Sequence, residues 1–294
     1  MLLLDYFFFF VIKAFQQCVR LLPERVQEHL GIFLGRIAFY ILKKRKRIAL
    51  RNIARVFHYK TEEEREDIAR RSFEKLGLNF IESLIIPYVP KHTFQKRFEI
   101  INRQYFDNAL ALKKGLIALV FHFGNWEIMG VTSFLLKHDI IALARPLKGH
   151  KRLNRFLNHV REETGLTIIP NENTLSDIMR HLRENKVVAI LADQREKRSR
   201  AVFVEFFGEK VPTMRGIALI GMKTGAPVMP VYMIRDGFLQ YRVVFNPPIE
   251  MEKKGTIDES VAANMRKVNA FLESLILKNP DEWFWVHRRW GRDS

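Results

Sequence analysis

Cysteine is almost absent from this sequence. Cys18 is the single cysteine among 294 residues, so an internal disulfide bond is impossible and a cysteine-based zinc site is excluded. Because disulfides belong to oxidising compartments, this composition favours a reducing, cytosol-facing body. The sequence also lacks phosphate-binding loops, dinucleotide glycine fingerprints and closely spaced histidine ligands, since His150 and His159 lie more than two helical turns apart. We therefore expect neither a metal ion nor any cofactor.

Acidic residues are few relative to basic ones. The chain has 32 Asp and Glu against 49 Lys and Arg, which gives a formal net charge of +17 and a pI near 10.0. Such a balance leaves nucleic acid, an anionic membrane face or acidic substrates as partners. Hydrophobic residues make up 48% of the chain and 24 residues are Phe. This content excludes global disorder and requires a core, a ligand cavity or lipid to bury the aromatic side chains.

Long uninterrupted apolar runs are missing as well. In the first segment, "MLLLDYFFFFVIKAF", Asp5 and Lys13 bracket seven uncharged residues, far short of the roughly 20 needed to span a bilayer. Asp5 also stands where a signal peptide needs Lys or Arg, and no small-x-small cleavage site follows. We interpret the segment as retained and lying in a membrane interface.

A second apolar stretch, residues 29–42, is followed at once by the basic run "KKRKR" of residues 43–47. Such a run beside an apolar helix attracts anionic lipid headgroups by about 1 kcal/mol per cation. A solvated basic helix end or a nucleic-acid patch is the alternative, but the adjacent Phe, Leu and Ile residues favour the membrane. We therefore predict membrane-associating helices over residues 1–60.

The remainder, residues 61–294, has the pattern of one α/β domain. Apolar residues at helical spacing predict a helix after Thr61, where Thr61 and Glu64 stand in capping-box register, and another before it, around residues 48–57 of the N-terminal segment. After Pro90, short apolar runs alternate with amphipathic stretches such as residues 151–164 and 174–184, which is typical of a sheet with helices packed on it. The predicted strands are "GLIALVF", "IIALAR", "LTIIP", "VVAILAD", "APVMPVYMI" and "YRVVF".

The segment "ALVFHFGNWEIMG", residues 118–130, joins a buried strand to a polar cluster. The strand should end near Phe121, and Asn125 is suited to cap the helix "WEIMGVTSFLLKH". His122 would then lie at the carboxyl edge of the sheet, where open α/β folds bind ligands. Glu127, in the first helical turn, would contact one imidazole nitrogen and make His122 a general base. Ordinary strand-end and helix-start residues are the alternative.

No serine or cysteine nucleophile accompanies this pair. The simplest chemistry therefore has His122 remove a proton from a hydroxyl that the substrate brings, without a covalent enzyme intermediate.

The block "HFGNWE" resembles the H-x4-D/E block of the glycerolipid acyltransferase superfamily, in the form found in the late acyltransferases of lipid A biosynthesis, the lauroyl and myristoyl transferases. The resemblance extends along nearly the whole chain. Its other matching features are "KKRKRIALRNIARVF", the "ARP" of Ala144 to Pro146, Arg161 and Gly165, "ILADQ" ending at Asp193 and Gln194, "VFVEFFGEKVPTMRG" with Phe206, Phe207, Gly208 and Thr213, "TGAPVMPVYMIR" and "PDEWFWVHRRW".

The resemblance implies a glycerol-3-phosphate acyltransferase-like fold, a mixed sheet flanked by helices behind an N-terminal membrane-anchoring segment. It implies transfer of a fatty acyl chain from an acyl carrier protein thioester to a hydroxyl of a lipid A precursor of the Kdo-lipid IVA type, at the cytoplasmic face of the inner membrane. The acceptor is typically the 3-hydroxyl of an acyl chain. His122 matches the family's general base and Glu127 its charge partner, while Asn125 and Trp126 complete the block.

Several other residues are expected to contact substrate. Arg145 follows an apolar run and would clamp a phosphate or carboxylate, unless it is a surface arginine before a helix. Arg161 either contacts substrate or belongs to a solvated basic face. Asp193 and Gln194 follow a buried strand, where a buried carboxylate needs partners, and Asp193 either touches substrate or braces the site. The charged loop of residues 195–201 would meet the acidic carrier protein or a sugar phosphate.

The segments nearer the C-terminus supply apolar candidates. Phe206 and Phe207 would form the wall of an acyl pocket, against ordinary core packing as the alternative. Gly208 and Thr213 are site residues by resemblance alone. The tail "WFWVHRRW" suits a lipid–water interface, although its aromatic residues would also stack on nucleic-acid bases or dock as a terminal helix.

Three rival functions stay open. An acyltransferase for another glycolipid, such as a phosphoinositol mannoside, is the nearest. A thioesterase would use similar chemistry on water. A basic nucleic-acid-binding protein has the charge in its favour, but no recognised motif supports it, so we expect anionic membrane lipids, the carrier protein and a glycolipid acceptor as partners, and no nucleic acid.

Overall fold

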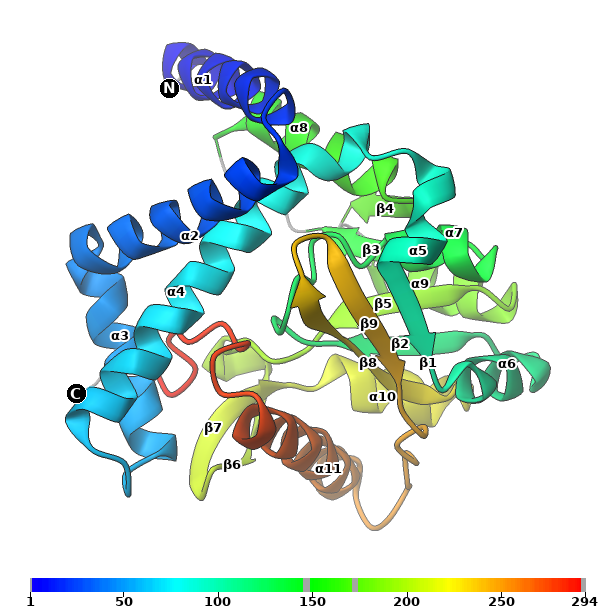
Figure 1. Ribbon diagram of the computed structural model, residues 1–294. Helices are drawn as coiled ribbons and strands as arrows, with labels where there is room; N and C mark the ends of the chain where they lie inside the picture. Colours follow the sequence, from blue (N-terminus) through cyan, green and yellow to red (C-terminus); the bar gives the residue numbers. More distant parts are fainter. Residues whose placement is uncertain (1, 145–148, 171–173, 292–294) are drawn as a thin grey trace.

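The computed structural model describes residues 2–144, 149–170 and 174–291. Four helices open the chain and pack on one another along its N-terminal side (Figure 1). α4 begins with the predicted capping box. The Thr61 hydroxyl accepts a hydrogen bond from the Glu64 amide at 3.2 Å, and the Glu64 carboxylate accepts one from the Thr61 amide at 2.8 Å. The four helices are α1 (Leu2–Arg20), α2 (Glu24–Ile41), α3 (Lys43–Val56) and α4 (Glu62–Ile85).

A seven-stranded mixed sheet forms the body, with the order β1-β9-β8-β2-β5-β3-β4. The pairing of β8 with β9 is antiparallel and the other pairs are parallel. Each of the six strands expected from the apolar runs is present, which confirms the α/β class and the mixed sheet flanked by helices. The strands are β1 (Phe98–Ile101), β2 (Leu116–Val120), β3 (Ile140–Ala144), β4 (Leu166–Pro170), β5 (Val187–Leu191), β8 (Val228–Gly237) and β9 (Gln240–Phe245).

Helices cover both faces of the sheet (Figure 1), and two hydrophobic clusters mark these faces. Alternation along β2 sends Leu116, Ala118 and Val120 into one cluster and Ile117 and Leu119 into the other. The first face carries α5 (Phe94–Arg97), α6 (Arg103–Ala111), α7 (Val131–Leu136) and α8 (Lys151–Glu163), and the second carries α9 (Thr174–Arg183), α10 (Gly216–Thr224) and α11 (Ile257–Lys278). The single-turn helices η1 (Ile86–Tyr88), η2 (Lys91–Thr93) and η3 (Arg198–Arg200) join these elements.

The hairpin of β6 (Ala201–Phe206) and β7 (Glu209–Met214) was not expected from the sequence. Phe207 and Gly208 form its two-residue turn with φ of 50° and 77°, the conformation that a tight hairpin of this kind requires. Phe206 and Phe207 of "FVEFFG" therefore serve the core and a turn, because Phe206 is fully buried and Phe207 lies in the turn. Neither residue lines the cavity beside His122 that is described below.

The C-terminal tail differs from the expected interfacial segment. Residues 279–291 are irregular, without a terminal helix, and Trp283 and Trp285 are only 2% and 0% exposed. The tail forms an antiparallel bridge between Trp283 and Phe123. The burial of Trp283 and Trp285 leaves no N–H group unpaired, because their indoles donate to Asp193 and to the Pro280 carbonyl.

The predicted division at residue 60 stays a prediction, and so does the anchoring role of residues 1–60. Interactions cross this position: Ile53 of α3 belongs to the core of the sheet's second face, and Asn52 donates to the Trp285 and His287 carbonyls at 2.7 and 2.8 Å. None of the helices in the described ranges is long and apolar enough to cross a bilayer.

α2 and α4 approach each other closely through glycine. A Cβ atom on Gly77 would lie 2.1 Å from the Gly31 carbonyl oxygen, and one on Gly35 would lie 2.3 Å from the Phe73 carbonyl oxygen. Both obstacles are backbone atoms, which cannot swing aside. Side chains any larger than hydrogen would push the two helices apart, so these glycines set the position of α4 and of the polar residues it carries.

We expect Gly77→Ala to destabilise the protein by about 1–3 kcal/mol through overpacking, although alanine is intrinsically the better helix former by about 1 kcal/mol. Urea unfolding monitored by circular dichroism measures the change. The matched control is Gly216→Ala, whose new methyl group would meet only Met214 at 3.9 Å. Equal or greater stability of Gly77→Ala would show that the helices do not need this contact.

Candidate active site

The carboxyl ends of β2 and β5 bring His122 and Asp193 together. These strands are parallel neighbours, so the residues that follow them meet at one edge of the sheet. Nδ1 of His122 lies 2.7 Å from Oδ1 of Asp193, and the His122 amide donates to Oδ2 at 3.0 Å. The indole of Trp283 also donates to Oδ2, at 2.9 Å. Asp193 is 3% exposed, and these hydrogen bonds stabilise its buried carboxylate.

The charge state of Asp193 determines the tautomer of His122. Although burial by itself raises the pKa of this carboxyl, the charge of His122 and the hydrogen bonds from His122 and Trp283 bring it below its usual value. An ionised carboxylate only accepts hydrogen bonds. In the neutral imidazole Nδ1 therefore carries the proton, and the lone pair of Nε2 is the acceptor that a general base needs.

Nε2 of His122 lies at the wall of a cavity. The side-chain amide of Gln194 approaches it at 3.0 Å and donates, in the position where a substrate hydroxyl would donate. The rings of Trp126 and Phe284 flank the imidazole, with centroids 5.0 and 5.8 Å from its own. The Asp193 carboxylate, the Gln194 amide and these two rings thus hold the imidazole at the cavity wall.

The expected contact between Glu127 and His122 is absent, and Asp193 takes its place. Both oxygens of Glu127 instead bind the guanidinium of Arg161, with Nε–Oε2 at 2.9 Å and Nη2–Oε1 at 3.1 Å. The Trp126 indole adds a hydrogen bond of 3.2 Å to Oε1. The expectation failed because residues 124–130 form turns and α7 begins only at Val131, which removes Glu127 from a helical first turn.

Asn125 does not cap a helix, which corrects the second local expectation. It is fully buried and donates to Glu82 at 2.8 Å. Glu82 of α4 also accepts from Arg235, the Leu239 amide and the Tyr241 hydroxyl. The burial of this network raises the pKa of Tyr241, so its hydroxyl keeps its proton and donates.

A second link from α4 supports the same loop. Asn79 donates to the Gly124 carbonyl at 2.7 Å and accepts from Arg235 at 2.6 Å. Sequence reasoning missed these residues and Trp283. The usable signal was Glu82, a carboxylate inside the apolar helical run "NFIESLII", because an acid at such a position needs a buried partner.

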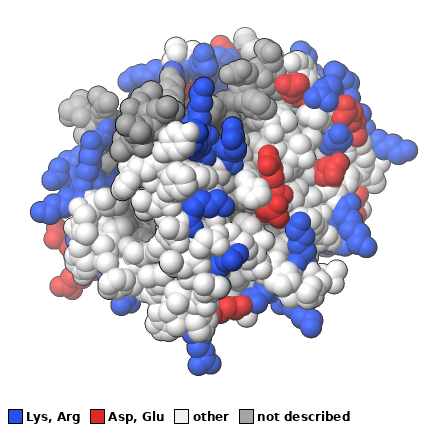
Figure 2. All heavy atoms as spheres, turned by 90° about the horizontal axis from the view of Figure 1, so that it is seen from above, with Lys and Arg blue, Asp and Glu red and all other residues white. Residues whose placement is uncertain are grey.

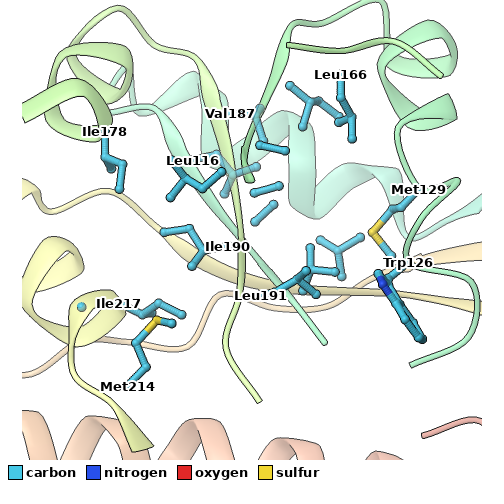
Figure 3. A pocket seen from close by; sticks show the side chains of 18 of the residues that line it. Leu116, Trp126, Met129, Leu166, Ile178, Val187, Ile190, Leu191, Met214 and Ile217 are labelled. Carbon is cyan, nitrogen blue, oxygen red and sulfur yellow. The ribbon is translucent and has the colours of Figure 1, made fainter. Parts of the chain in front are cut away.

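The cavity beside His122 has a volume of about 910 Å³ and a mainly apolar wall (Figure 3). His122, Trp126, Glu127, Arg161 and Gln194 line it, whereas Asn125 and Asp193 lie behind this wall and support it. Arg161 is therefore neither a solvated surface residue nor an isolated cation, since it pairs with Glu127 at the cavity.

The remaining predicted substrate contacts lie elsewhere. Phe207 and Gly208 form the hairpin turn described above and do not line the cavity. Thr213 is fully buried, and its hydroxyl accepts a hydrogen bond from the Arg289 guanidinium at 2.7 Å. The β6–β7 hairpin thus places these three residues outside the wall of this cavity, and their contact with substrate stays a prediction. Arg145 lies outside the described residues.

A histidine oriented by a buried carboxylate, opening onto a large apolar cavity, defines a site for base-assisted group transfer involving an apolar substrate. Within the described ranges, no group of three or more His, Cys, Asp and Glu side chains is placed to hold a metal ion. The expected absence of a metal stays a prediction.

Comparison with known proteins agrees with this class. The sequence model of the bacterial lipid A biosynthesis acyltransferases matches residues 1–292. The chain belongs to this family of acyltransferases, as its motifs predicted.

Curated relatives have the same character. The lipid A biosynthesis palmitoleoyltransferase of Escherichia coli K12 is 28% identical over 270 residues, covering 91% of this chain and 86% of the relative. The lauroyltransferase of the same organism is 26% identical over 273 residues, with coverage of 91% and 86%. A phosphatidylinositol mannoside acyltransferase of Mycolicibacterium smegmatis is 26% identical over 224 residues, with coverage of 74% and 72%.

His287 generates a pH prediction. Burial lowers the pKa of its imidazole from 6.5 to about 4, and its Nε2 accepts the Arg195 amide at 2.9 Å. Below pH 6.5 the His287 imidazole is protonated in the unfolded chain, whereas in the folded protein it becomes protonated only at about pH 4. Stability from this group is therefore complete above pH 6.5 and is lost progressively between pH 6.5 and 4.

We expect His287→Gln to reduce this acid loss by up to about 3 kcal/mol, because glutamine accepts a hydrogen bond and never takes a charge. Urea unfolding at pH 7, 6, 5 and 4 measures it. His159→Gln, at an exposed position on α8, is the control. Parallel stability curves for the wild type and His287→Gln would contradict the prediction.

Proposed function

We propose that this protein transfers a fatty acyl chain from the thioester of acyl carrier protein to a hydroxyl of a lipid A precursor of the Kdo-lipid IVA type. Family membership and the names of the relatives support the acyl transfer and the lipid A class. The observation that carries the proposal is the orientation of His122, whose Nδ1 is held by Asp193 while Nε2 faces an apolar cavity.

In the proposed reaction, Nε2 of His122 accepts the proton of the acceptor hydroxyl, after Gln194 has given up its position. The oxygen attacks the thioester carbonyl carbon, the carbon–sulfur bond breaks and the proton passes to the sulfur. No serine or cysteine lines the cavity in the described part of the chain, which fits direct transfer. Asp193 stabilises the imidazolium that forms.

Glu127 has a different task in this proposal. Its two hydrogen bonds hold the guanidinium of Arg161 at the cavity wall. A fixed cation there stabilises the negative oxygen of the tetrahedral intermediate. Glu127 then acts through Arg161 as a positioning residue, and the charge partner of the base is Asp193.

The carrier protein as donor is supported by the charge beside the cavity. Lys197 and Arg198 are exposed on the loop that leads from Gln194 to β6, and they lie outside the cavity wall. Cations placed there face an acidic protein docked at the entrance, and such complementarity speeds encounter.

A membrane as partner is supported by the apolar surface of the N-terminal helices. Figure 2 looks onto the α1 end and shows broad uncharged areas among Lys and Arg side chains. Phe7 and Phe10 of α1 are 61% and 62% exposed, and Ile41 of α2 is 69% exposed beside the basic start of α3. We propose that these helices lie in the cytoplasmic face of the inner membrane, with the cations at anionic headgroups.

The direct test is acyl transfer by the purified protein in anionic vesicles, with lauroyl and palmitoleoyl acyl carrier protein as donors and Kdo-lipid IVA as acceptor. Mass spectrometry detects the acylated product. His122→Ala should lower the rate by about 10²–10⁴, whereas His159→Ala, at an exposed position outside the cavity wall, should not. Wild-type transfer by His122→Ala would disprove the base assignment, and release of free fatty acid alone would indicate a thioesterase.

Variants of the two carboxylates, Asp193 and Glu127, should differ in the pH dependence of their activity. Asp193→Asn should lower kcat by about 10³–10⁴, because an amide side chain no longer enforces the tautomer with its proton on Nδ1. It should also shift the acidic limb of the pH–rate profile, where activity falls because the general base takes up a proton. Glu127→Gln should lower kcat by about 10²–10³ by loosening the cation, with the profile unchanged. An altered pH profile for Glu127→Gln only would assign the charge-partner role to Glu127.

A second acceptor class is favoured by the similarity to phosphatidylinositol mannoside acyltransferases. A panel that offers Kdo-lipid IVA and a phosphatidylinositol mannoside to the same preparation decides between them. Preference for the mannoside would retain the acyl transfer and replace the acceptor.

A further inference from the structure

The cavity takes its wall from both faces of the sheet. Ile190 and Leu191 follow one another on β5 and point to opposite sides (Figure 3). Met129 and Trp126 lie on the Leu191 side. On the Ile190 side are Ile178 of α9, Ile217 of α10 and Met214. A single acyl chain needs only one of these two sides.

The two sides are joined where β3 and β5 separate. Their pairing covers residues 140–142 and ends with Ala142 opposite Ala189, although β3 continues to residue 144 and β5 to residue 191. At this point Ala142 and the next residue, Leu143, which point to opposite faces, both line the same cavity. The carboxyl ends of these strands therefore leave an opening between the two faces, close to His122 and Gln194.

One side, here called the alanine compartment, is floored by Ala118, Ala142 and Ala189. These residues are in register across β2, β5 and β3, so their short side chains leave a channel over the sheet. The wall continues to the first residues of the strands, Leu116 and Val187. At about 3.3 Å per residue, a five-residue strand gives a depth of roughly 13 Å, and the depth suits an unbranched acyl chain.

The other side, here called the α10 compartment, is walled by Leu143, Leu175, Ile178, Ile190 and Leu219. Arg195, Arg200 and Arg215 line the cavity in addition to Arg161, and Arg215 directly precedes α10. Arg215 also pairs with Asp258. Arginines that line a cavity can bind the phosphate of a molecule that enters the cavity. The acidic side chains of a docked carrier protein stay outside the cavity and do not reach these arginines.

We propose that the two compartments hold two acyl chains at once: the donor's chain in the alanine compartment and a chain of the acceptor in the α10 compartment. The acceptor is then an acylated, phosphorylated glycolipid whose phosphate binds Arg195 and Arg200. Its hydroxyl reaches Nε2 of His122 between the compartments, where the new ester bond forms and the thioester bond breaks. This assignment rests on the proposed function and adds the site of the acceptor.

Neighbouring residues of β3 provide a matched test. Ala142→Leu fills the alanine compartment and Leu143→Trp fills the α10 compartment. Donors are decanoyl, lauroyl, myristoyl and palmitoyl acyl carrier protein. Acceptor probes are glucosamine phosphates that carry a 3-hydroxydecanoyl or a 3-hydroxymyristoyl chain. Leu277→Trp, half exposed on α11 and outside the cavity wall, controls for the added tryptophan.

Ala142→Leu should lower the ratio of palmitoyl to decanoyl transfer by about tenfold or more, with the acceptor ratio unchanged. Leu143→Trp should lower the ratio of long to short acceptor by a similar factor, with the donor ratio unchanged. If Ala142→Leu does not fold, Ala189→Val makes the same test from β5.

Donor ratios that shift in both variants would show one continuous tunnel. Acceptor ratios that shift in neither variant would show that no acceptor chain enters the two compartments. Either result would overturn the inference and leave the proposed function standing. A wild-type protein that transfers no acyl chain to either probe or to Kdo-lipid IVA would overturn the proposed function and the inference with it.

Discussion

The hydrogen bond between His122 and Asp193 is the interaction on which the site depends. It joins residues that follow two adjacent parallel strands, so the order of the sheet creates it. The bond assigns the proton of the neutral imidazole to Nδ1 and leaves Nε2 as the acceptor, which the Gln194 amide contacts at the cavity wall. Trp283 extends this arrangement to the C-terminal tail, since its indole donates to the same carboxylate. The burial of the tail is therefore part of the site's construction.

The N-terminal helices contribute to the site through buried polar contacts. α4 supplies Asn79 and Glu82, which hold the Gly124 carbonyl and the Asn125 side chain. These contacts need α4 at a fixed distance, and Gly35 and Gly77 set that distance against α2. Helices that expose Phe7, Phe10 and Ile41 on the outside are thus connected to the loop that carries His122.

The opening of the sheet between β3 and β5 gives the cavity its character. Because the strands separate beyond residue 142, a channel floored by alanine and a second apolar space share one entrance. Four arginines among the described residues line this cavity, and Glu127 pairs with one of them, Arg161. The proposed reaction between two amphiphiles makes use of both spaces.

The amino-acid sequence already contained what depends on neighbours along the chain: the α/β class, six strands, the capping box of α4 and the family motifs around His122. It left open what depends on residues brought together from a distance. Glu127 is five residues from His122, yet the partner of the imidazole is Asp193, 71 positions away. Hydrophobic periodicity reports which face of an element is buried, whereas the pairing of buried charges follows from strand order and loop shape. Only the folded chain decided that Glu127 binds Arg161, that Phe207 and Gly208 form a turn, and that the tail's tryptophans face inward.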